Sequence, residues 1–414
     1  MRTGPKLATT NRARILVIES NEDGTVGGSH QALFDLVVGL DKDSFEPIVL
    51  FYQHNVFVEK LRARGIEVVL FELSPRVKGL RGPAGLIGKA IKFGKDVVRC
   101  RRELQRLRIK VLHMNNSPSI GNDNWLPAAR SLGIPCLVTS MGNATRADRL
   151  IHRWLSRQFD VYLAISRYVA QTLRMQGVDS NRIELIYLGV DFESLRDRVK
   201  RPRDAVRKDL GVQPNHILLL MVGNIREWKG QREVIAALRL LPERVRARVR
   251  VCFAGATARA DADYESVVKS EVVRSGLEEC VSFLGARSDV PELLSAADIA
   301  IHASISPEPF GLVVPEAMGL GCAVIAASTG GPAEVVAPGT GLLCDPAHPE
   351  QYARAIEHLV QDAELRRAIG AAAPARAAIF SIERNIEETS RVYHRLLAAS
   401  KSRLPLTRAK LPVA

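Results

Sequence analysis

The stretch SPEPFGLVVPEAMG, residues 306–319, places two carboxylates eight positions apart on either side of a glycine turn. The carboxylates belong to Glu308 and Glu316. Gly311 between them permits a tight turn and a close approach of the backbone to a ligand. Pro315 is compatible with the first turn of a helix, so the stretch predicts a loop that opens onto a short helix.

The start of this helix would present its first amides to an anion, because those N–H groups lack acceptors within the helix. They belong to Gly311, Leu312 and Val313. A carboxylate beyond the turn can accept hydrogen bonds from sugar hydroxyls, so one loop could hold a diphosphate and a sugar together. The spacing alone leaves a second interpretation open, in which both glutamates are simply solvated.

Apolar runs of strand length alternate with helical patterns along the chain, which is typical of a parallel α/β sheet. In the first half, strands are expected over residues 14–19, 47–52, 67–71, 111–114, 136–140, 161–165 and 183–187. In the second half, they are expected over residues 216–222, 250–254, 281–284, 299–303, 323–326 and 341–344. The charged segment 196–209 separates two Rossmann-like halves, which predicts a ligand cleft at the carboxyl ends of the strands.

Residues 308–312, Glu-Pro-Phe-Gly-Leu, followed by Glu-Ala at 316–317, resemble the E-x7-E signature of retaining GT-B glycosyltransferases of the family 4 type. The resemblance continues through GLGCAVI at 319–325 and TGGPAEVV at 329–336. It is strong over residues 217–393 and weaker before them. It implies an α/β fold of the GT-B kind, with two Rossmann-like domains facing a cleft.

The same resemblance implies a division of labour between the domains. The first domain, residues 1–200, would bind the acceptor, and the second, residues 205–380, would bind the nucleotide-sugar. A helix over residues 381–400 would cross back to the first domain. A basic tail over residues 401–414 would follow it.

The resemblance also gives roles to residues of the donor pocket. Glu316 would bind the ribose hydroxyls, and Glu308 would lie near the transferred sugar. The backbone amides that face sugar and phosphate would belong to Phe310, Gly311 and Leu312. The turns that hold the nucleobase would be formed by Gly255, Leu284 and Gly285, and for the two glycines a plain turn role stays open.

The segment GNIREWKG, residues 223–230, carries two cations between a strand end and a helix. Positive charge is needed there to neutralise a diphosphate leaving group, although surface charges at a helix start are the alternative. The segment resembles the Gly-Arg…Lys-Gly segment of the family, and Lys229 falls on the lysine position. Asn224 occupies the arginine position, and Arg226 lies two residues later. Lys229 is assigned to the leaving phosphate by its position, and Arg226 is assigned to it on the assumption that its side chain reaches that far.

In the first half, Gly27 and Gly28 resemble the Gly-Gly loop that lies under the phosphate and the acceptor in this family. Ser29 could at the same time serve as an ordinary N-cap. Many relatives carry a histidine after the strand 136–140, and this chain does not, although Asn143 could supply a hydrogen bond there. Asn115 stands where relatives often have the second histidine of a His-x-His segment.

Retention of configuration calls for a nucleophile or for attack from the front face assisted by the leaving phosphate. The resemblance favours front-face attack, and Glu308 as a nucleophile is the alternative. The DxD pairs at 41–43 and 261–263 are interpreted as solvated loops. We therefore expect no metal and no cofactor, with the nucleotide diphosphate-sugar as a substrate.

The net charge of +13 is concentrated in two places. Residues 73–110 hold twelve Lys or Arg against two acids, a net +10, and the tail 401–414 adds +4. An apolar stripe at helical spacing runs through the first segment and is expected to pack on the first sheet. The stripe comprises Leu86, Ala90, Phe93, Val97, Cys100, Leu104 and Leu107.

The basic segment over residues 76–110 has three interpretations. It could be a solvated surface. It could dock on an anionic membrane, as family members with lipid-linked acceptors often do, with each Lys or Arg adding about 1 kcal/mol. It could bind nucleic acid, which is least favoured because no aromatic interleaving or binding motif accompanies the charge. No nucleic-acid partner is therefore expected.

The remaining composition indicates a cytoplasmic protein, with peripheral membrane association as an option. The longest apolar run, residues 217–222, is too short to span a bilayer, and residues 1–14 lack a secretory signal. The six cysteines have no metal-ligand spacing and are interpreted as reduced.

Together these features predict a retaining hexosyltransferase that uses a UDP- or GDP-sugar and a saccharide or lipid-linked acceptor, in cell-surface polysaccharide synthesis. Two alternatives stay open. One is a nucleotide-sugar epimerase or hydrolase of the same fold. The other is a non-catalytic nucleotide-sugar-binding scaffold at a membrane, which the missing histidine near Met141 would favour.

Overall fold

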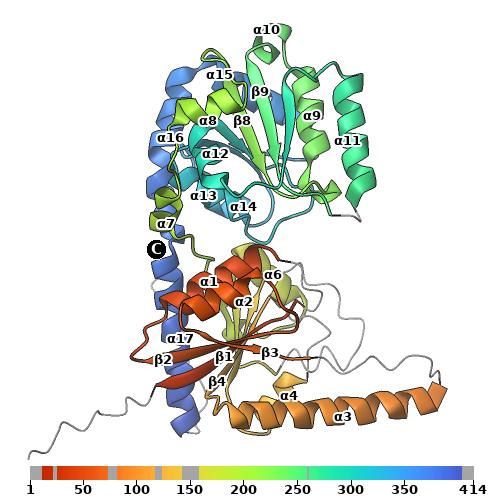
Figure 1. The fold of residues 1–414 in the computed structure, drawn as a ribbon, viewed down its shortest axis with the longest axis vertical. Helices are drawn as coiled ribbons and strands as arrows, with labels where there is room; N and C mark the ends of the chain where they lie inside the picture. The colour runs from red at the N-terminus through yellow and green to blue at the C-terminus, as the bar shows by residue number, and fades with distance from the viewer. Residues whose placement is uncertain are drawn as a thin grey trace, which may run out of the picture. The chain divides into compact units, whose positions relative to one another are not determined.

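The computed structural model describes residues 12–21, 26–72, 82–116, 124–141, 158–258 and 261–402. Its contacts divide the chain into two compact units. The first unit comprises Met1–Ile165, Val169–Tyr187 and Asn385–Ala414, and the second comprises Ser166–Tyr168 and Leu188–Arg384. Each is an α/β unit around its own sheet, as the alternation of strands and helices predicts (Figure 1).

The first unit is built on a seven-stranded sheet in which all neighbouring strands run parallel. In sheet order its strands are β3 (Glu67–Leu70), β2 (Phe45–Phe51), β1 (Ala13–Glu19), β4 (Val111–Asn115), β5 (Cys136–Ser140), β6 (Val161–Ala164) and β7 (Ile183–Leu185). The central strands are continuous apolar runs because both faces of a parallel sheet are covered. Residues 15–18 of β1, for example, are completely buried.

Helices cover both faces of this sheet. They are α1 (Gly28–Gly39), α2 (Val56–Ala63), α3 (Gly82–Arg106), α4 (Trp125–Arg130) and α6 (Arg167–Met175). In Figure 1, α1 and α2 lie on one face, and α3 and α4 lie on the other. The cluster of buried side chains beneath α1 and α2 also contains Val392, Tyr393 and Leu396, which come from the last helix, α17 (Ile382–Ser402).

The last helix therefore returns to the first unit, which confirms the predicted crossing. A buried polar contact fixes it there, since the hydroxyl of Tyr393 lies 2.6 Å from Nδ1 of His113. The other ring nitrogen of His113 lies 2.7 Å from Oγ1 of Thr139. Burial lowers the pKa of His113 to about 3, so the imidazole is neutral. Both of its ring nitrogens are hydrogen-bonded.

The second unit is built on a six-stranded parallel sheet. In sheet order its strands are β10 (Val281–Gly285), β9 (Val249–Ala254), β8 (Ile217–Val222), β11 (Ile299–Ile301), β12 (Ala323–Ala327) and β13 (Leu342–Cys344). The order reverses between β8 and β11, which is the doubly wound arrangement of a Rossmann-like sheet. In such sheets ligands bind at the carboxyl ends of the strands near the reversal.

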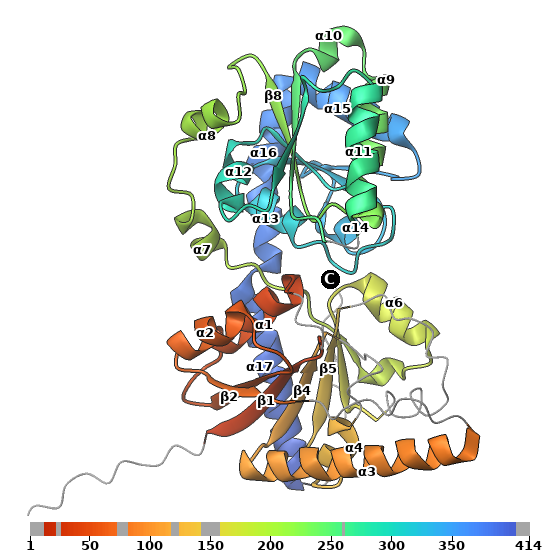
Figure 2. The same ribbon diagram turned by 45° about the vertical axis from the view of Figure 1, so that its right-hand side comes forward.

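Helices again cover both faces of the sheet. In chain order they are α7 (Phe192–Asp197), α8 (Arg203–Asp209), α9 (Gln231–Leu240), α10 (Glu243–Arg246), α11 (Ala262–Arg274), α12 (Val290–Ala296), α13 (Val313–Gly319), α14 (Pro332–Val335), α15 (Pro349–Gln361) and α16 (Ala363–Ala377). Figure 2 shows α9 and α11 on one side of the second sheet, with α12, α13 and α16 on the other.

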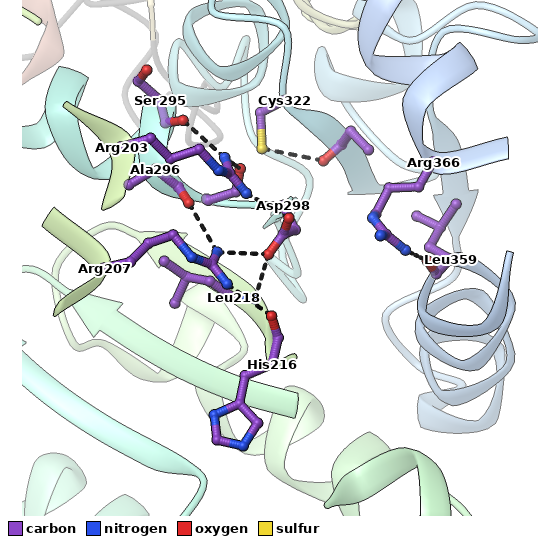
Figure 3. Close-up of polar contacts among 12 residues, drawn as sticks. Arg203, Arg207, His216, Leu218, Ser295, Ala296, Asp298, Cys322, Leu359 and Arg366 are labelled. Carbon is purple, nitrogen blue, oxygen red and sulfur yellow. Dashed lines mark hydrogen bonds and ion pairs between the residues drawn. The ribbon is translucent and has the colours of Figure 1, made fainter. Parts of the chain in front are cut away.

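The charged segment before this sheet belongs to the second unit. Asp298 lies between Arg203 and Arg207 of α8, and Figure 3 shows both guanidinium groups directed at its carboxylate. The same carboxylate accepts a hydrogen bond from the backbone N–H of Leu218 at 2.8 Å. Because these contacts fasten α8 to the start of β8, residues 188–209 pack with the second unit.

Helix α3 follows the predicted apolar stripe over only part of its length. Cys100, Leu104 and the following Leu107 are buried, whereas Phe93 is 39% exposed. Figures 1 and 2 agree that the N-terminal half of α3 extends beyond the sheet of the first unit. None of the helices in the described ranges combines the length and apolar character needed to cross a membrane.

Candidate functional site

Three glycines meet at the carboxyl ends of β8, β9 and β10. The backbone N–H of Gly255 donates to the carbonyl of Gly285 at 2.8 Å, and that of Gly223 donates to Ala254 at 2.9 Å. A Cβ atom at position 255 would lie 2.0 Å from the carbonyl oxygen of Gly223, so a side chain cannot fit there. Gly255 and the pair Leu284–Gly285 are therefore brought together at one edge of the sheet.

Lys229 extends from this edge toward the loop that carries Glu308. It ends a short 3-10 turn, Glu227–Lys229, and its aliphatic carbons run within 3.6 Å of a Cβ atom built on Gly223. Its Nζ donates to Oε1 of Glu308 at 2.8 Å and lies 4.3 Å from the ring centroid of Trp228. Both partners of the ion pair are 15% exposed, so the pair is largely shielded from water.

The second carboxylate oxygen of Glu308 accepts two more hydrogen bonds. Nε2 of His302 lies 2.6 Å from Oε2, and the hydroxyl of Ser304 lies 2.9 Å from it. Burial alone would raise the pKa of Glu308, but the hydrogen bonds and charges of His302 and Lys229 outweigh it and hold the pKa well below its usual value. Glu308 is thus ionised, and Nε2 of His302 must carry the proton of their hydrogen bond.

The loop that carries Glu308 is also held by the glycine pair at positions 330 and 331. The backbone N–H of Gly331 donates to the carbonyl of Glu308 at 2.8 Å. Gly311 has a φ of +78°, and a Cβ atom there would lie 2.9 Å from Pro332, so the predicted glycine turn is present. Phe310 is buried with its ring edge-on to Phe380, at 5.7 Å between centroids.

The short helix predicted after this turn is α13. Leu312 is its N-cap, and the helix begins at Val313. Glu316 lies in its first turn and is half-buried, with its backbone N–H donating to the carbonyl of Leu312 at 3.1 Å. The first amides of α13 have no helical acceptors, as at any helix start.

Arg226 is placed apart from Lys229 and Glu308. Its Nε donates to Asp261 at 2.8 Å, so the arginine pairs with the first acid of one DxD pair and not with Glu308. In the other DxD pair, Asp41 accepts hydrogen bonds from Ser44 and from the backbone of Asp43, which closes an exposed turn. Within the described ranges, no group of three or more His, Cys, Asp or Glu side chains could hold a metal ion.

In the first unit, Gly27 is the N-cap of α1 and Gly28 is its first residue, and both are exposed. Ser29 is therefore not the N-cap, and its hydroxyl lies 3.5 Å from Oε1 of Glu19 instead. Asn143 lies outside the described residues, as do residues 76–81 of the basic segment and residues 403–414 of the tail.

Glu19, at the end of β1, was not singled out by sequence reasoning. It is fully buried and accepts hydrogen bonds from the side-chain amides of Asn115 at 2.7 Å and Asn116 at 3.1 Å. Burial outweighs these hydrogen bonds and raises the pKa of Glu19 to about 7. Asn116 has a φ of +61°, uncommon outside glycine. A carboxylate at the end of an apolar strand was the available signal.

His302 and Ser304 were also missed by sequence reasoning. They follow β11 directly, and both are buried. Polar residues immediately after a buried strand of a doubly wound sheet lie at its ligand-binding edge, so their position was the signal. We term the group formed by Glu308, Lys229, His302 and Ser304 the carboxylate cluster. It is a largely shielded ion pair with two further hydrogen bonds, at the carboxyl ends of β8 and β11.

Two family models match the chain. The model described as "Glycosyl transferases group 1" matches residues 202–376, which lie in the second unit. The model described as "Glycosyltransferase Family 4" matches residues 26–194.

Curated relatives with the name D-inositol 3-phosphate glycosyltransferase match as well. The protein of Rhodococcus opacus (strain B4) is 31% identical over 349 residues, covering 83% of this chain and 71% of the relative. The protein of Corynebacterium jeikeium (strain K411) is 30% identical over 228 residues. That match covers 54% of each protein, so the chain spans about half the length of this relative.

Solved structures show the same architecture. HepE of Anabaena in complex with UDP superposes with a TM-score of 0.77 at 24% identity, covering 92% of this chain and 99% of HepE. Sucrose-phosphate synthase of Thermosynechococcus elongatus superposes with a TM-score of 0.70 at 20% identity, covering 94% of this chain and 100% of the synthase chain. With its two Rossmann-like units, its matches to both family models and its similarity to the R. opacus enzyme, the chain belongs to the group 1, or family 4, glycosyltransferases of GT-B fold.

Proposed function

We propose that this glycosyltransferase moves a hexose from a nucleotide diphosphate-sugar to a saccharide or lipid-linked acceptor, with retention of configuration and without a metal ion. The observation that carries the proposal is the ion pair between Lys229 and Glu308. It stands at the carboxyl edge of β8 and β11, where the order of the second sheet reverses. A cation and an acceptor of sugar hydroxyls thus lie side by side in a shielded place.

UDP-hexoses are the first donors to consider. HepE of Anabaena has been solved in complex with UDP and glucose and in complex with UDP-glucose, and its fold is shared by this chain. The three glycines at the ends of β8, β9 and β10 offer backbone atoms to a nucleobase. Glu316 is proposed to accept hydrogen bonds from the ribose hydroxyls, and GDP-hexoses remain the second class of donor.

The proposed reaction breaks the bond between the anomeric carbon and the β-phosphate oxygen. The acceptor oxygen forms its bond on the face that the phosphate leaves, and its proton passes to the leaving phosphate. Lys229 neutralises the negative charge that develops on that phosphate, which is where preorganised charge is most effective. Glu308 remains ionised and accepts a hydrogen bond from a hydroxyl of the hexose. Arg226 contributes only if it exchanges Asp261 for the diphosphate.

The acceptor class draws its support from the relatives. The curated relatives carry the name D-inositol 3-phosphate glycosyltransferase, so a phosphorylated polyol joins saccharides and lipid-linked sugars as a candidate acceptor. We place the acceptor in the first unit, near Gly27 and Gly28. A role in cell-surface polysaccharide synthesis is proposed from the family resemblance alone.

Peripheral binding to an anionic membrane at the cytoplasmic face is proposed for α3. Ile87, Ile91 and Val98 are 62%, 55% and 47% exposed, and their spacing of four and seven places them on one side of the helix. Lys89 and Lys95 are exposed on the same helix. Apolar side chains beside lysines on a projecting helix suit the boundary between headgroups and acyl chains.

The proposal is tested by product analysis with UDP- and GDP-hexoses. Each donor is incubated with and without acceptors of three classes, namely a saccharide, a lipid-linked sugar and D-inositol 3-phosphate, in buffer with and without EDTA. We expect transfer only with an acceptor, undiminished by EDTA, and an NMR anomeric signal that matches the donor. Acceptor-free conversion would indicate an epimerase or hydrolase, and no conversion at all would indicate a binding protein.

A further inference from the structure

Oε2 of Glu308 receives two hydrogen bonds from groups that have no part in the proposed reaction. The donors are Nε2 of His302 and the hydroxyl of Ser304, and these residues are 4% and 1% exposed. Together with Lys229 on Oε1, they occupy the carboxylate from three directions. A carboxylate with three donors from rigid elements has little freedom to turn.

His302 is itself held at both ends of its backbone. Its N–H donates to the carbonyl of Ile325 in β12 at 2.8 Å, and its carbonyl accepts from the hydroxyl of Tyr352 in α15 at 3.1 Å. Tyr352 is fully buried. The backbone of His302 is thus fixed by β12 and α15, which lie outside the loop that carries Glu308.

His302 differs in its hydrogen bonding from His113, the other buried histidine described above. Both ring nitrogens of His113 are hydrogen-bonded, as is usual for a buried histidine with a purely structural role. In His302, only Nε2 is paired, because Nδ1 is buried without a partner among the described residues. The imidazole therefore carries the cost of an unpaired atom while aiming its N–H at Glu308.

Lys229 cannot serve as the sole orienting group for Glu308 if it also neutralises the leaving diphosphate. The two negative groups would then compete for one ammonium, and Glu308 would keep its place only through Oε2. We propose that His302, with Ser304, is a positioning residue that fixes the carboxylate of Glu308 toward the hexose of the donor. This inference rests on the proposed function and adds a determinant of sugar orientation to it.

Three variants measure the effect on catalysis. His302→Leu removes the N–H donor, whereas His302→Gln keeps an N–H at a similar reach, and Ser304→Ala removes the second donor. We expect His302→Leu to lower kcat by about tenfold to a hundredfold, which corresponds to one hydrogen bond to a charged group. The dissociation constant of UDP, which lacks the hexose, should change by less than about threefold.

His302→Gln should restore most of the lost activity, and Ser304→Ala should fall between the parent and His302→Leu. His358→Leu is the matched control, since His358 is exposed in the same unit. An unchanged kcat in His302→Leu overturns the proposal. Equal losses in kcat and UDP affinity in both His302 variants also overturn it, since they indicate a general structural defect.

A second readout is independent of activity. The protein, which has nine histidines, is labelled with 15N-histidine, and the His302 signal is assigned by its loss in His302→Gln. The hydroxyl of Ser304 also lies 3.2 Å from Nε2 of His302, so Glu308→Ala is combined with Ser304→Ala. We expect a low-field proton bonded to Nε2 in the parent and in Ser304→Ala, and its loss in the double variant. A signal that survives in the double variant overturns the positioning role. A parent that shows the signal but transfers no hexose from any donor overturns the proposed function instead.

Discussion

At the scale of single residues, the sequence predicted the two members of the central ion pair but not the groups around them. Glu308 and Lys229 were assigned to one pocket although 79 positions separate them, and the structure joins them at 2.8 Å. Their roles stay predictions. Arg226 was assigned to the same pocket and instead pairs with Asp261. A cation's partner depends on where the chain brings its acids, which spacing along the sequence does not reveal.

Glu19 shows the same limit in the first unit. Its partner Asn115 is 96 positions away, so the contact follows from the pairing of β1 with β4. Asn115 was noted only as a departure from a familiar histidine. With Glu19 in view, the asparagine has a partner of its own, because its amide donates to the carboxylate at 2.7 Å.

Replacing Lys229 tests the charge at the leaving group. Lys229→Gln should lower kcat by about tenfold to a hundredfold, because a neutral amide cannot offset the charge that develops on the phosphate. Steady-state kinetics with a UDP-hexose measure this. Lys269→Gln is the matched control, since Lys269 forms an exposed ion pair with Glu265 on α11. Equal rates for Lys229→Gln and Lys269→Gln would contradict the assignment.

Glu19 predicts a dependence of stability on pH. Its pKa is about 7 in the folded protein against an ordinary 4.5, so the folded state holds more protons between these values. The stability contributed by the protonated carboxyl is fully present below pH 4.5 and is lost as the pH rises through 7. The total loss is about 3 kcal/mol.

Glu19→Gln should abolish this loss. Melting temperatures of the parent and of Glu19→Gln, measured from pH 4.5 to 7.5, should therefore diverge in favour of the variant as the pH rises. Glu72→Gln, at an exposed position of the same unit, is the control and should follow the parent. A difference between Glu19→Gln and the parent that stays constant with pH would argue against a proton held on Glu19.

At the scale of elements, the fold was largely predictable. Each of the runs expected as a strand contains one, of three to seven residues, because the strands of a covered parallel sheet are short apolar segments bounded by turns. The apolar stripe over residues 86–107 likewise predicted α3. The stripe could not predict how far the sheet extends beneath the helix, and residues 87–95 of α3 are largely exposed where packing was expected.

The anchoring of α8 gives a prediction at this scale. Arg207 is 7% exposed, and Asp298→Ala would leave its guanidinium buried without a carboxylate. Loss of one partner from a buried pair costs about 3–5 kcal/mol. The melting temperature, followed by circular dichroism, should therefore fall clearly in Asp298→Ala. Asp209→Ala, which breaks an exposed pair with Arg201, should change it little, and similar changes in both variants would contradict the anchoring.

At the scale of the whole molecule, the resemblance predicted the family, and both family models and the R. opacus relative confirm it. The geometry of the second unit was the more predictable one, because its motif lies within a single loop. The first unit was less so, because Asn115 departs from the familiar pattern and Asn143 lies outside the described residues. The assignment of donor and acceptor to the two units stays a prediction.

The proposed docking of α3 on an anionic membrane concerns the whole protein and is tested on liposomes. Charge reversal of Lys89 and Lys95 together should weaken binding to anionic liposomes by about 2 kcal/mol or more, at about 1 kcal/mol for each basic side chain. Lys92 is left unchanged because it pairs with Asp96 at 2.5 Å. Sedimentation with liposomes of neutral and of anionic phospholipid measures the effect.

The matched control reverses Arg239 and Arg274, which are exposed on α9 and α11 of the second unit. This change alters the net charge of the protein equally and should leave liposome binding close to that of the parent. Equal losses in both double variants would indicate a general effect of net charge. A parent that ignores anionic liposomes would contradict membrane docking altogether.

The central claim is that the loop from Glu308 to Glu316 binds a nucleotide diphosphate-sugar. Its most direct test is isothermal titration of the parent and of Glu316→Ala with UDP and with GDP. The proposed hydrogen bonds from ribose hydroxyls to a carboxylate predict that one of the two nucleotides binds the parent and binds the variant about tenfold to a hundredfold more weakly. Unchanged affinity for both UDP and GDP in Glu316→Ala would contradict this placement of the donor.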